Sequence, residues 1–344
     1  MMRIGLATTI EDHAPSYHLR FRSVLNALQR QGKVADYSII RKTFFGKRGR
    51  ISFEERTDGI LIARLRDLGL LKKVFDYAKS RKVPVIYETD DLILYERRSD
   101  SPIDGADAVT ACLKQAACII ASTSYLAEEL KPLNSVVTVF PNLLDPGIWN
   151  IPDSIRVHED GQMKICCIGT GLMAENLSFI IPAMEYCEKK YGTNVIFSLW
   201  GNVKYLDERV RKLKNVTLTG KKVPYMKFAR ELQASSYAFG VVPLSDLRFN
   251  RAKSNIKYLE YAVSGIPAIF SQVEAYAAVS DRETCLLVEN DPDAWKQGIT
   301  SMIEDGGLRE RLARNAFMQV KDRFILNETW TAQYVSILES CCGR

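Results

Sequence analysis

The segment PLSDLRFNRAKSNIKYLEYAVSGIP, residues 243–267, lies between two short apolar runs, residues 237–242 and 268–271. Ser254 is a favoured N-cap residue, and Gly265 is a typical residue just beyond a helix end. Between these two positions the apolar residues recur at helical spacing. The segment therefore predicts a strand, a polar loop, a helix and a second strand, which is the repeating unit of an α/β fold.

Short apolar runs of the kind that form strands buried on both faces alternate with longer amphipathic segments along the whole chain. In the first half these runs are residues 3–8, 36–40, 59–63, 83–88, 118–122 and 136–140. In the second half they are residues 164–168, 194–200, 216–219, 237–242, 268–271 and 285–288. The alternation indicates βαβ units, and therefore parallel sheets joined by right-handed crossovers.

The alternation pauses once, over residues 145–163, which are polar and contain several prolines and glycines. A chain of 344 residues fits two domains of ordinary size. We therefore expect two doubly wound domains, residues 1–155 and 156–324, with ligands at the carboxyl ends of their strands and in the cleft between them.

Composition restricts the class of protein. The net charge of +6 is modest for this length and does not by itself imply nucleic acid. No apolar run approaches the roughly 20 residues that span a bilayer, and the N-terminus leads directly into a strand, so we expect a cytoplasmic protein. The eight cysteines form no C-x-x-C pair, which argues against a zinc site, and so large and apolar a chain is not expected to need a disulfide framework.

Charged residues in the 243–267 segment indicate a ligand. Free N–H groups and a partial positive charge make a helix N-terminus a phosphate site. Lys253 precedes the predicted helix and Lys257 lies in its first turn, so both can neutralise a diphosphate. Glu260, one turn further, can accept hydrogen bonds from ribose hydroxyls. The alternative is a solvated basic loop in which Lys257 and Glu260 form an ordinary surface pair.

The same segment resembles the donor-binding segment of bacterial retaining glycosyltransferases of the GT-B fold, in the large family-4 group. The shared pattern is PL-x-D-x-x-FN-x-x-KS-x-x-K-x-x-EY-x-x-x-G-x-P. The matching residues are Pro243, Leu244, Asp246, Phe249, Asn250, Lys253, Ser254, Lys257, Glu260, Tyr261, Gly265 and Pro267. The resemblance implies two Rossmann-like domains, with a sugar nucleotide bound to the second and an acceptor bound to the first.

Further stretches extend the resemblance over nearly the whole chain. IGTGLMAENL, residues 168–177, is similar to the first turn of the family's donor domain, and the final helix, within residues 325–344, is expected to pack back on the N-terminal domain. The residues expected to bind the donor are Gly169, Thr170, Gly171, Asn250, Lys253, Ser254, Asn255, Ile256, Lys257 and Glu260. No metal and no cofactor beyond the donor are expected.

Asp90 and Asp91, in the stretch YETDDLI at residues 87–93, directly follow a predicted strand. In the family this loop lies near the transferred sugar, so these carboxylates, with Lys257, are the expected catalytic residues. They would orient hydroxyls or assist removal of the acceptor proton. The alternative is that one of them only caps the next helix.

One position departs from the family pattern. Many members carry a Glu-x7-Glu pair in the donor segment; Glu260 matches the second acid, and Ala252 occupies the place of the first. In the family the first acid contacts the transferred sugar. The sequence therefore predicts the nucleotide half of the donor site better than the sugar half.

The basic residues at 41–50, from Arg41 to Arg50, lie beside two phenylalanines and suit an anionic membrane surface or a lipid diphosphate acceptor. A solvated charged face is the alternative. The expected role is transfer of a sugar to a glycan or lipid-linked acceptor in bacterial polysaccharide or lipopolysaccharide synthesis. Two other functions stay open: a nucleotide-sugar epimerase of GT-B architecture, and a phage glycosyltransferase acting on modified DNA bases, although nucleic acid is not the expected partner.

Overall fold

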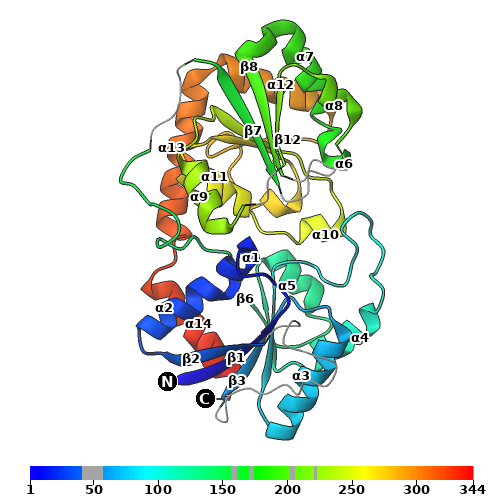
Figure 1. Cartoon of the computed structure of the whole chain (residues 1–344), viewed down its shortest axis with the longest axis vertical. Coiled ribbons are helices and arrows are strands. Elements are labelled where there is room, and N and C mark those ends of the chain that lie inside the picture. The colour runs from blue at the N-terminus through cyan, green and yellow to red at the C-terminus, as the bar shows by residue number, and fades with distance from the viewer. Residues whose placement is uncertain (41–56, 156–160, 170–173, 202–205, 221–222, 344) are drawn as a thin grey trace. The chain divides into compact units, whose positions relative to one another are not determined.

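The computed structural model describes residues 1–40, 57–155, 161–169, 174–201, 206–220 and 223–343. Within these residues the chain forms two compact units (Figure 1). Unit 1 consists of Met1–Asp145, Leu247–Ser254 and Leu326–Arg344, and unit 2 of Pro146–Asp246 and Asn255–Ile325. This division differs from the predicted boundary at residue 155, and it places Leu247–Ser254 with the N-terminal part of the chain.

Unit 1 is built on a parallel sheet that has six strands among its described residues, in the order β2-β1-β3-β4-β5-β6. The strands are β1 (Met2–Thr8), β2 (Val34–Ile40), β3 (Gly59–Ala63), β4 (Val85–Thr89), β5 (Cys118–Ala121) and β6 (Val137–Val139). The strand order reverses between β1 and β3, and in such sheets the crevice at this point, outside the carboxyl ends of the strands, binds ligands.

Helices cover both faces of this sheet (Figure 1). One face is covered by α2 (Ser23–Arg30) and α14 (Glu328–Cys341), preceded in the chain by α1 (Pro15–Tyr17) and the π-helical turn η1 (His18–Arg22). The other is covered by α3 (Leu68–Arg81), α4 (Ala106–Gln115) and α5 (Ser124–Leu130). The short helix α10 (Arg248–Arg251) joins this second layer through the buried side chains of Phe249 and Ala252.

Unit 2 also has a six-stranded parallel sheet among its described residues, in the order β12-β11-β10-β7-β8-β9. The strands are β7 (Met163–Gly169), β8 (Val195–Gly201), β9 (Val216–Thr219), β10 (Phe239–Val242), β11 (Ala268–Ser271) and β12 (Leu286–Val288). The order reverses between β7 and β10, as in a dinucleotide-binding fold. All twelve predicted strands are present, and the prediction of two doubly wound parallel domains is confirmed.

The helices of unit 2 also form two layers (Figure 1). On one face lie α7 (Ile181–Tyr191) and α12 (Pro292–Glu304), and on the other lie α9 (Tyr225–Gln233), α11 (Ile256–Val263) and α13 (Gly306–Arg323). The remaining short elements are α6 (Ala174–Leu177), α8 (Glu208–Lys212) and the 3-10 turns η3 (Gly192–Asn194) and η4 (Glu274–Tyr276).

Helix α11 ends as the sequence predicts. Gly265 has a φ of 70°, a left-handed conformation that glycine adopts without steric cost. Its N–H donates to the carbonyl of Ala262 at 3.1 Å, and the N–H of Ile266 donates to the carbonyl of Tyr261 at 3.0 Å. This pair of bonds is a Schellman motif, which satisfies the last carbonyls of the helix and turns the chain toward β11.

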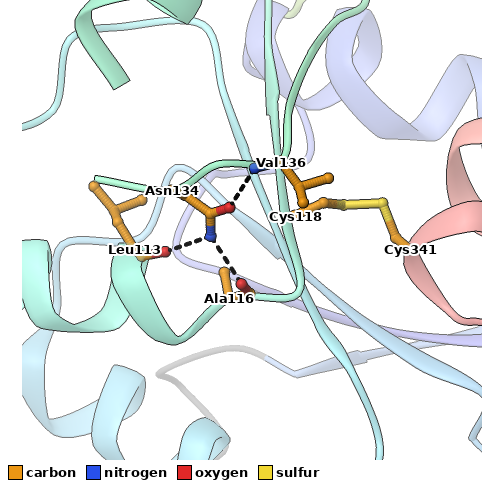
Figure 2. Close-up of a disulfide and its surroundings, with 6 residues drawn as sticks. All are labelled: Leu113, Ala116, Cys118, Asn134, Val136 and Cys341. Atoms are coloured by element: carbon orange, nitrogen blue, oxygen red, sulfur yellow. Dashed lines mark hydrogen bonds between the residues drawn. A yellow bond between two sulfur atoms is a disulfide. The ribbon is translucent and has the colours of Figure 1, made fainter. Parts of the chain in front are cut away.

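One expectation about the cysteines is wrong. Cys118, at the start of β5, and Cys341, at the end of α14, form a disulfide (Figure 2). Their separation of 223 residues gives no sequence signal of the pairing, because only the packing of α14 on unit 1 brings them together. Beside this bond, the Asn134 amide donates to the carbonyls of Leu113 and Ala116 at 2.9 and 2.8 Å and closes the end of α4.

No helix in the described part of the chain is both long and apolar enough to cross a bilayer. The basic segment from Arg41 to Arg50 lies outside the described residues, so its predicted membrane contact stays a prediction.

Candidate functional site

The N-terminus of α11 begins the candidate donor site of unit 2. Strands β7 and β10 are neighbours at the point where strand order reverses, and Gly169 is the last residue of β7. Asn255 is the N-cap of α11 and makes no side-chain capping bond, so it leaves the first N–H groups available to an anion. Thr170 and Gly171, predicted here as well, lie outside the described residues.

Lys257 and Glu260 form a tight ion pair one turn into α11, with 2.6 Å between Lys257 Nζ and Glu260 Oε2. The Glu260 side chain is only 2% exposed, and the Lys257 ammonium lies 5.0 Å from the ring centroid of Phe228. The alternative of an ordinary surface pair is therefore wrong. Burying a carboxylate has a cost in free energy that surface pairs do not have, and Lys257 offsets part of it.

A ring of hydrogen bonds that was not predicted from the sequence fixes the loop after β10. The N–H of Leu244 donates to Ser271 Oγ at 2.8 Å, Ser271 Oγ donates to Asn290 Oδ1 at 2.7 Å, and Asn290 Nδ2 donates to the Leu244 carbonyl at 2.9 Å. Asn176 Oδ1 accepts from the N–H of Ser245 at 2.8 Å. Ser271 and Asn290 are polar residues at or just after the ends of predicted strands, and this position was the sequence signal that could have indicated them.

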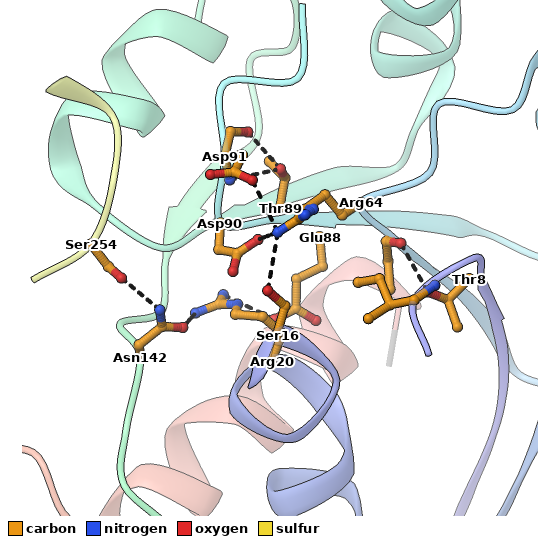
Figure 3. Close-up of polar contacts among 12 residues, drawn as sticks. Thr8, Ser16, Arg20, Arg64, Glu88, Thr89, Asp90, Asp91, Asn142 and Ser254 are labelled. Carbon is orange, nitrogen blue, oxygen red and sulfur yellow. Dashed lines mark hydrogen bonds and ion pairs between the residues drawn. The ribbon is translucent and has the colours of Figure 1, made fainter. Parts of the chain in front are cut away.

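Three predicted donor residues, Asn250, Lys253 and Ser254, belong to unit 1. Ser254 is not the N-cap of α11, because its hydroxyl accepts a hydrogen bond from Asn142 Nδ2 at 2.7 Å (Figure 3). The Asn250 side chain is buried. Asn255, Ile256, Lys257 and Glu260 belong to unit 2. The predicted donor segment is therefore divided between the two units at residues 254 and 255.

The location of Ala252 accounts for the departure from the family pattern at this position. Its side chain is fully buried in the core of unit 1, and its carbonyl accepts a hydrogen bond from Thr123 Oγ1 at 3.2 Å. A glutamate at this position would place a carboxylate in an apolar cluster that contains Phe249.

Asp90 and Asp91, directly after the end of β4, share one cation (Figure 3). Arg64 Nη1 lies 3.1 Å from Asp90 Oδ1 and 3.0 Å from Asp91 Oδ2, and it also donates to Ser16 Oγ at 3.0 Å. Burial alone would raise the pKa of Asp90, but Arg64 and Arg20 hold it below its ordinary value. The pKa of Asp91 is raised, first by burial and then by the charge of Asp90. Two adjacent carboxylates thus acquire different proton affinities.

A buried polar network lies next to this pair. Arg20 Nη2 lies 2.9 Å from Glu88 Oε1, and the hydroxyl of Tyr334 donates to Glu88 Oε2 at 2.8 Å. Arg20 Nη1 also donates to the Phe140 carbonyl at 2.8 Å and to Asn142 Oδ1 at 2.9 Å. Burial raises the pKa of Glu88 to about 7, despite Arg20 and Tyr334. The sequence did not indicate this network, because its members come from widely separated positions.

Lys253 is close to the same cluster. Its ammonium lies 5.4 Å from the ring centroid of Phe249. Burial lowers the pKa of Lys253, and the carboxylate of Asp91 opposes that shift. In unit 1 the structure therefore brings together Asp90, Asp91 and Lys253, which lie far apart in the sequence.

Residues 162–305 match the family model described as glycosyl transferases group 1. This range includes every described strand of unit 2, together with Gly169, Lys257 and Glu260. These residues are therefore similar to a glycosyl transferases group 1 domain. The predicted resemblance to glycosyltransferases is thereby confirmed for this part of the chain. The chain has no significant match among curated protein sequences.

Solved structures with the same fold extend the likeness beyond the group 1 domain. HepE of Anabaena, in complex with UDP and glucose, has a TM-score of 0.71 at 13% identity, covering 99% of this chain and 100% of HepE. The sucrose-phosphate synthase of Thermosynechococcus elongatus has a TM-score of 0.72 at 14% identity, covering 98% of each chain. At such identities the likeness establishes the fold, and the predicted GT-B class is confirmed.

The solved structure of TarM has a similar fold but a longer chain. It has a TM-score of 0.63 at 14% identity, and the match covers 82% of this chain but only 55% of TarM. The chain therefore spans about half the length of TarM.

Proposed function

We propose that the protein is a glycosyltransferase that moves a sugar from a nucleoside-diphosphate sugar to an acceptor hydroxyl. The observation that supports this best is the buried Glu260, paired with Lys257 beside the uncapped N-terminus of α11, inside a group 1 domain. The solved structures of HepE in complex with UDP and with UDP-glucose support the same class of donor.

In this proposal unit 2 binds the nucleotide. The N–H groups of α11 and the ammonium of Lys257 stabilise the negative charge that develops on the diphosphate as its bond to the anomeric carbon breaks. Glu260 accepts hydrogen bonds from the ribose hydroxyls, in exchange for part of its contact with Lys257. Gly169 lets the backbone at the end of β7 approach the donor closely.

Unit 1 binds the acceptor. As the acceptor oxygen forms its bond to the anomeric carbon, its proton must leave, and Asp91 is our candidate for taking it up. The raised pKa of Asp91 makes it a better proton acceptor than Asp90, which Arg64 keeps ionised. We propose that the anomeric configuration is retained, and that the product contributes to a bacterial cell-surface polysaccharide or lipopolysaccharide.

We also propose that no metal ion takes part. Among the described residues no group of three or more acidic, histidine or cysteine side chains is arranged to hold one. The expectation is checked by turnover in excess chelator, which should equal turnover in added magnesium.

The donor is tested by melting the full chain in the presence of nucleoside diphosphates and their sugars. We expect at least one nucleoside diphosphate to raise the melting temperature, because a ligand that binds only the folded state stabilises it. Free nucleoside diphosphate should then be released from the matching sugar nucleotide only when an acceptor is added. No thermal shift with any nucleotide would overturn the proposal, and sugar epimerisation without nucleotide release would replace it with an epimerase.

A further inference from the structure

Unit 1 contains a cavity of about 390 Å³ at the point where its strand order reverses. The cavity is lined by residues that follow the carboxyl ends of three neighbouring strands: Thr9 and Ile10 after β1, Arg64 and Arg66 after β3, and Asp91 after β4. Its volume is within the range of small-molecule sites, and its position is the expected one for a ligand of a doubly wound sheet.

Three guanidinium groups line this cavity, those of Arg64, Arg66 and Arg97. Arg64 is held by Asp90, Asp91 and Ser16. Its φ of 45° is left-handed, a strained conformation for a residue with a side chain. Its N–H donates to the carbonyl of Glu88 at 2.8 Å, which helps to hold that conformation. Residues in such conformations cluster at active sites, ligand clamps and switch regions.

The positive charges of Arg66 and Arg97 are much less neutralised than that of Arg64. Arg66 forms no ion pair among the described residues, and its Nη2 reaches only the carbonyl of Tyr95, at 3.4 Å. Burial and the charge of Arg97 lower the pKa of Arg66, which indicates that its environment disfavours its own charge. Arg97 Nη2 is 3.9 Å from Asp91 Oδ2, at the outer limit of an ion pair. The guanidinium groups of Arg66 and Arg97 thus line the cavity with little negative charge close to them.

The acidic side chains around the cavity have other partners. Glu11 Oε2 lies 3.0 Å from His13 Nε2, and Asp67 Oδ1 accepts from the N–H of Leu70 as the N-cap of α3. Asp91 is already shared with Arg64. Lys253 adds a further cation near Asp91. The cations of the cavity therefore favour a negatively charged ligand, because the nearby carboxylates are already held by other partners.

We propose that this cavity binds a phosphate group of the acceptor, held by Arg66 and Arg97, while Arg64 holds Asp91 in place beside it. Arginine suits a phosphate because its planar fork of N–H groups can make two parallel bonds to phosphate oxygens. The inference rests on the proposed function and specifies its acceptor class: a phosphorylated sugar or the phosphate of a lipid-linked glycan. The two sources share this chemistry.

The test measures binding to the full chain without any sugar nucleotide. Calorimetric titrations compare glucose 6-phosphate with glucose, and inorganic phosphate serves as competitor. We expect glucose 6-phosphate to bind at least about tenfold more tightly than glucose, and phosphate to displace it. Arg66→Ala and Arg97→Ala should remove this preference, and Arg66→Lys should restore part of it. Arg81→Ala, at an exposed arginine at the end of α3, should leave it unchanged.

Vesicles distinguish the two sources of phosphate. If the group belongs to a lipid, flotation with phosphatidylglycerol vesicles should exceed flotation with phosphatidylcholine vesicles and should fall in Arg66→Ala. If it belongs to a soluble sugar, only the glucose 6-phosphate preference should depend on Arg66.

Two results would overturn the inference. One is equal affinity for glucose and glucose 6-phosphate together with flotation that does not depend on Arg66. The other is unchanged phosphate preference in both Arg66→Ala and Arg97→Ala variants that melt like the wild type. Neither readout needs the donor site. A chain that binds phosphate at Arg66 but shows no thermal shift with nucleotides would reject the proposed function alone.

Discussion

At the scale of single residues, Glu88 shows how burial can outweigh an ion pair. Its carboxylate has no access to solvent, and contacts with Arg20 and Tyr334 do not compensate fully for the lost hydration. Its pKa therefore rises from an ordinary 4.5 to about 7. Folding and proton uptake are linked through this group.

We expect unit 1 to lose stability as pH rises from about 4.5 to about 7. In this window the folded state holds more protons on Glu88 than the unfolded state, so raising the pH favours unfolding; below the window the penalty is absent. Melting temperatures across the window should fall less steeply in Glu88→Gln than in the wild type. Tyr334→Phe, which removes a donor to the carboxylate, should extend the fall to higher pH. Identical slopes in all three proteins would contradict this assignment.

The donor site gives a second prediction at this scale. Glu260→Ala should weaken nucleotide binding by about 1.5–3 kcal/mol, because it removes a charged partner of the ribose hydroxyls. Lys257→Ala should chiefly reduce kcat, since it removes charge opposite the leaving group. The matched control is the exposed pair on α9, where Lys227 Nζ and Glu231 Oε1 lie 3.5 Å apart. Alanine at either control position should change neither quantity, and an equal effect there would refute the assignment.

Residue types and spacing were enough to place Lys257 and Glu260 one turn apart on a short helix that ends before Gly265, whereas their assignment to a donor site came from the family resemblance. They could not predict that Ser254 is bonded to Asn142, 112 residues away, or that Arg20 meets Glu88. Such contacts depend on which helix packs on which face of a sheet. The predicted roles of Asp90, Asp91 and the donor residues stay predictions.

At the scale of elements, the position of α11 depends on a close approach to strand β10. A Cβ added at Gly240 would lie 2.5 Å from Cε2 of Tyr261, nearer than any real contact of this kind. Only glycine therefore lets the Tyr261 ring lie against the strand. The sequence predicted both elements, but the need for a glycine between them follows from their spacing in three dimensions.

We expect Gly240→Ala to destabilise unit 2 by about 1–3 kcal/mol and to weaken nucleotide binding, because α11 must shift to relieve the overlap. Gly307→Ala in the first turn of α13 is the control. Its added Cβ would be 3.4 Å from Asp305 Oδ1, an ordinary contact, and alanine there should stabilise by about 0.4–1 kcal/mol. Chemical denaturation and nucleotide titration measure both effects. A Gly240→Ala protein as stable as the wild type would show that the helix position is not limited by this contact.

At the scale of the whole molecule, the chain enters unit 1 three times. The middle entry, Leu247–Ser254, is fastened by Phe249 and Ala252 in the core and by Arg248, whose Nη2 lies 2.6 Å from Glu129 Oε2. The sequence predicted a change of domain near residue 155 and a return of the final helix to the N-terminal domain, where Leu326–Arg344 is found. It did not predict that residues 247–254 belong to unit 1, because the apolar residues of so short a loop do not indicate which of the two cores they pack in.

Phe249→Ala should therefore destabilise unit 1 rather than unit 2, by about 3–5 kcal/mol, although both its neighbouring strands belong to unit 2. Hydrogen exchange measured by mass spectrometry should show faster exchange in α3, α4 and α5, with the sheet of unit 2 little changed. Met226→Ala, at an exposed position of α9, is the control and should alter neither unit. Faster exchange confined to unit 2 would contradict the assignment of residues 247–254.

The disulfide has a mechanical consequence. Every residue of unit 2 lies between Cys118 and Cys341 in the chain. Tension applied to the two ends of the protein would run from the N-terminus to Cys118, across the sulfur atoms to Cys341 and out through the residues that follow α14, so unit 2 would bear no load. A pulling experiment would not extend the roughly 223 residues of this loop, about 740–800 Å of extended chain, until a thiol reductant opened the bond.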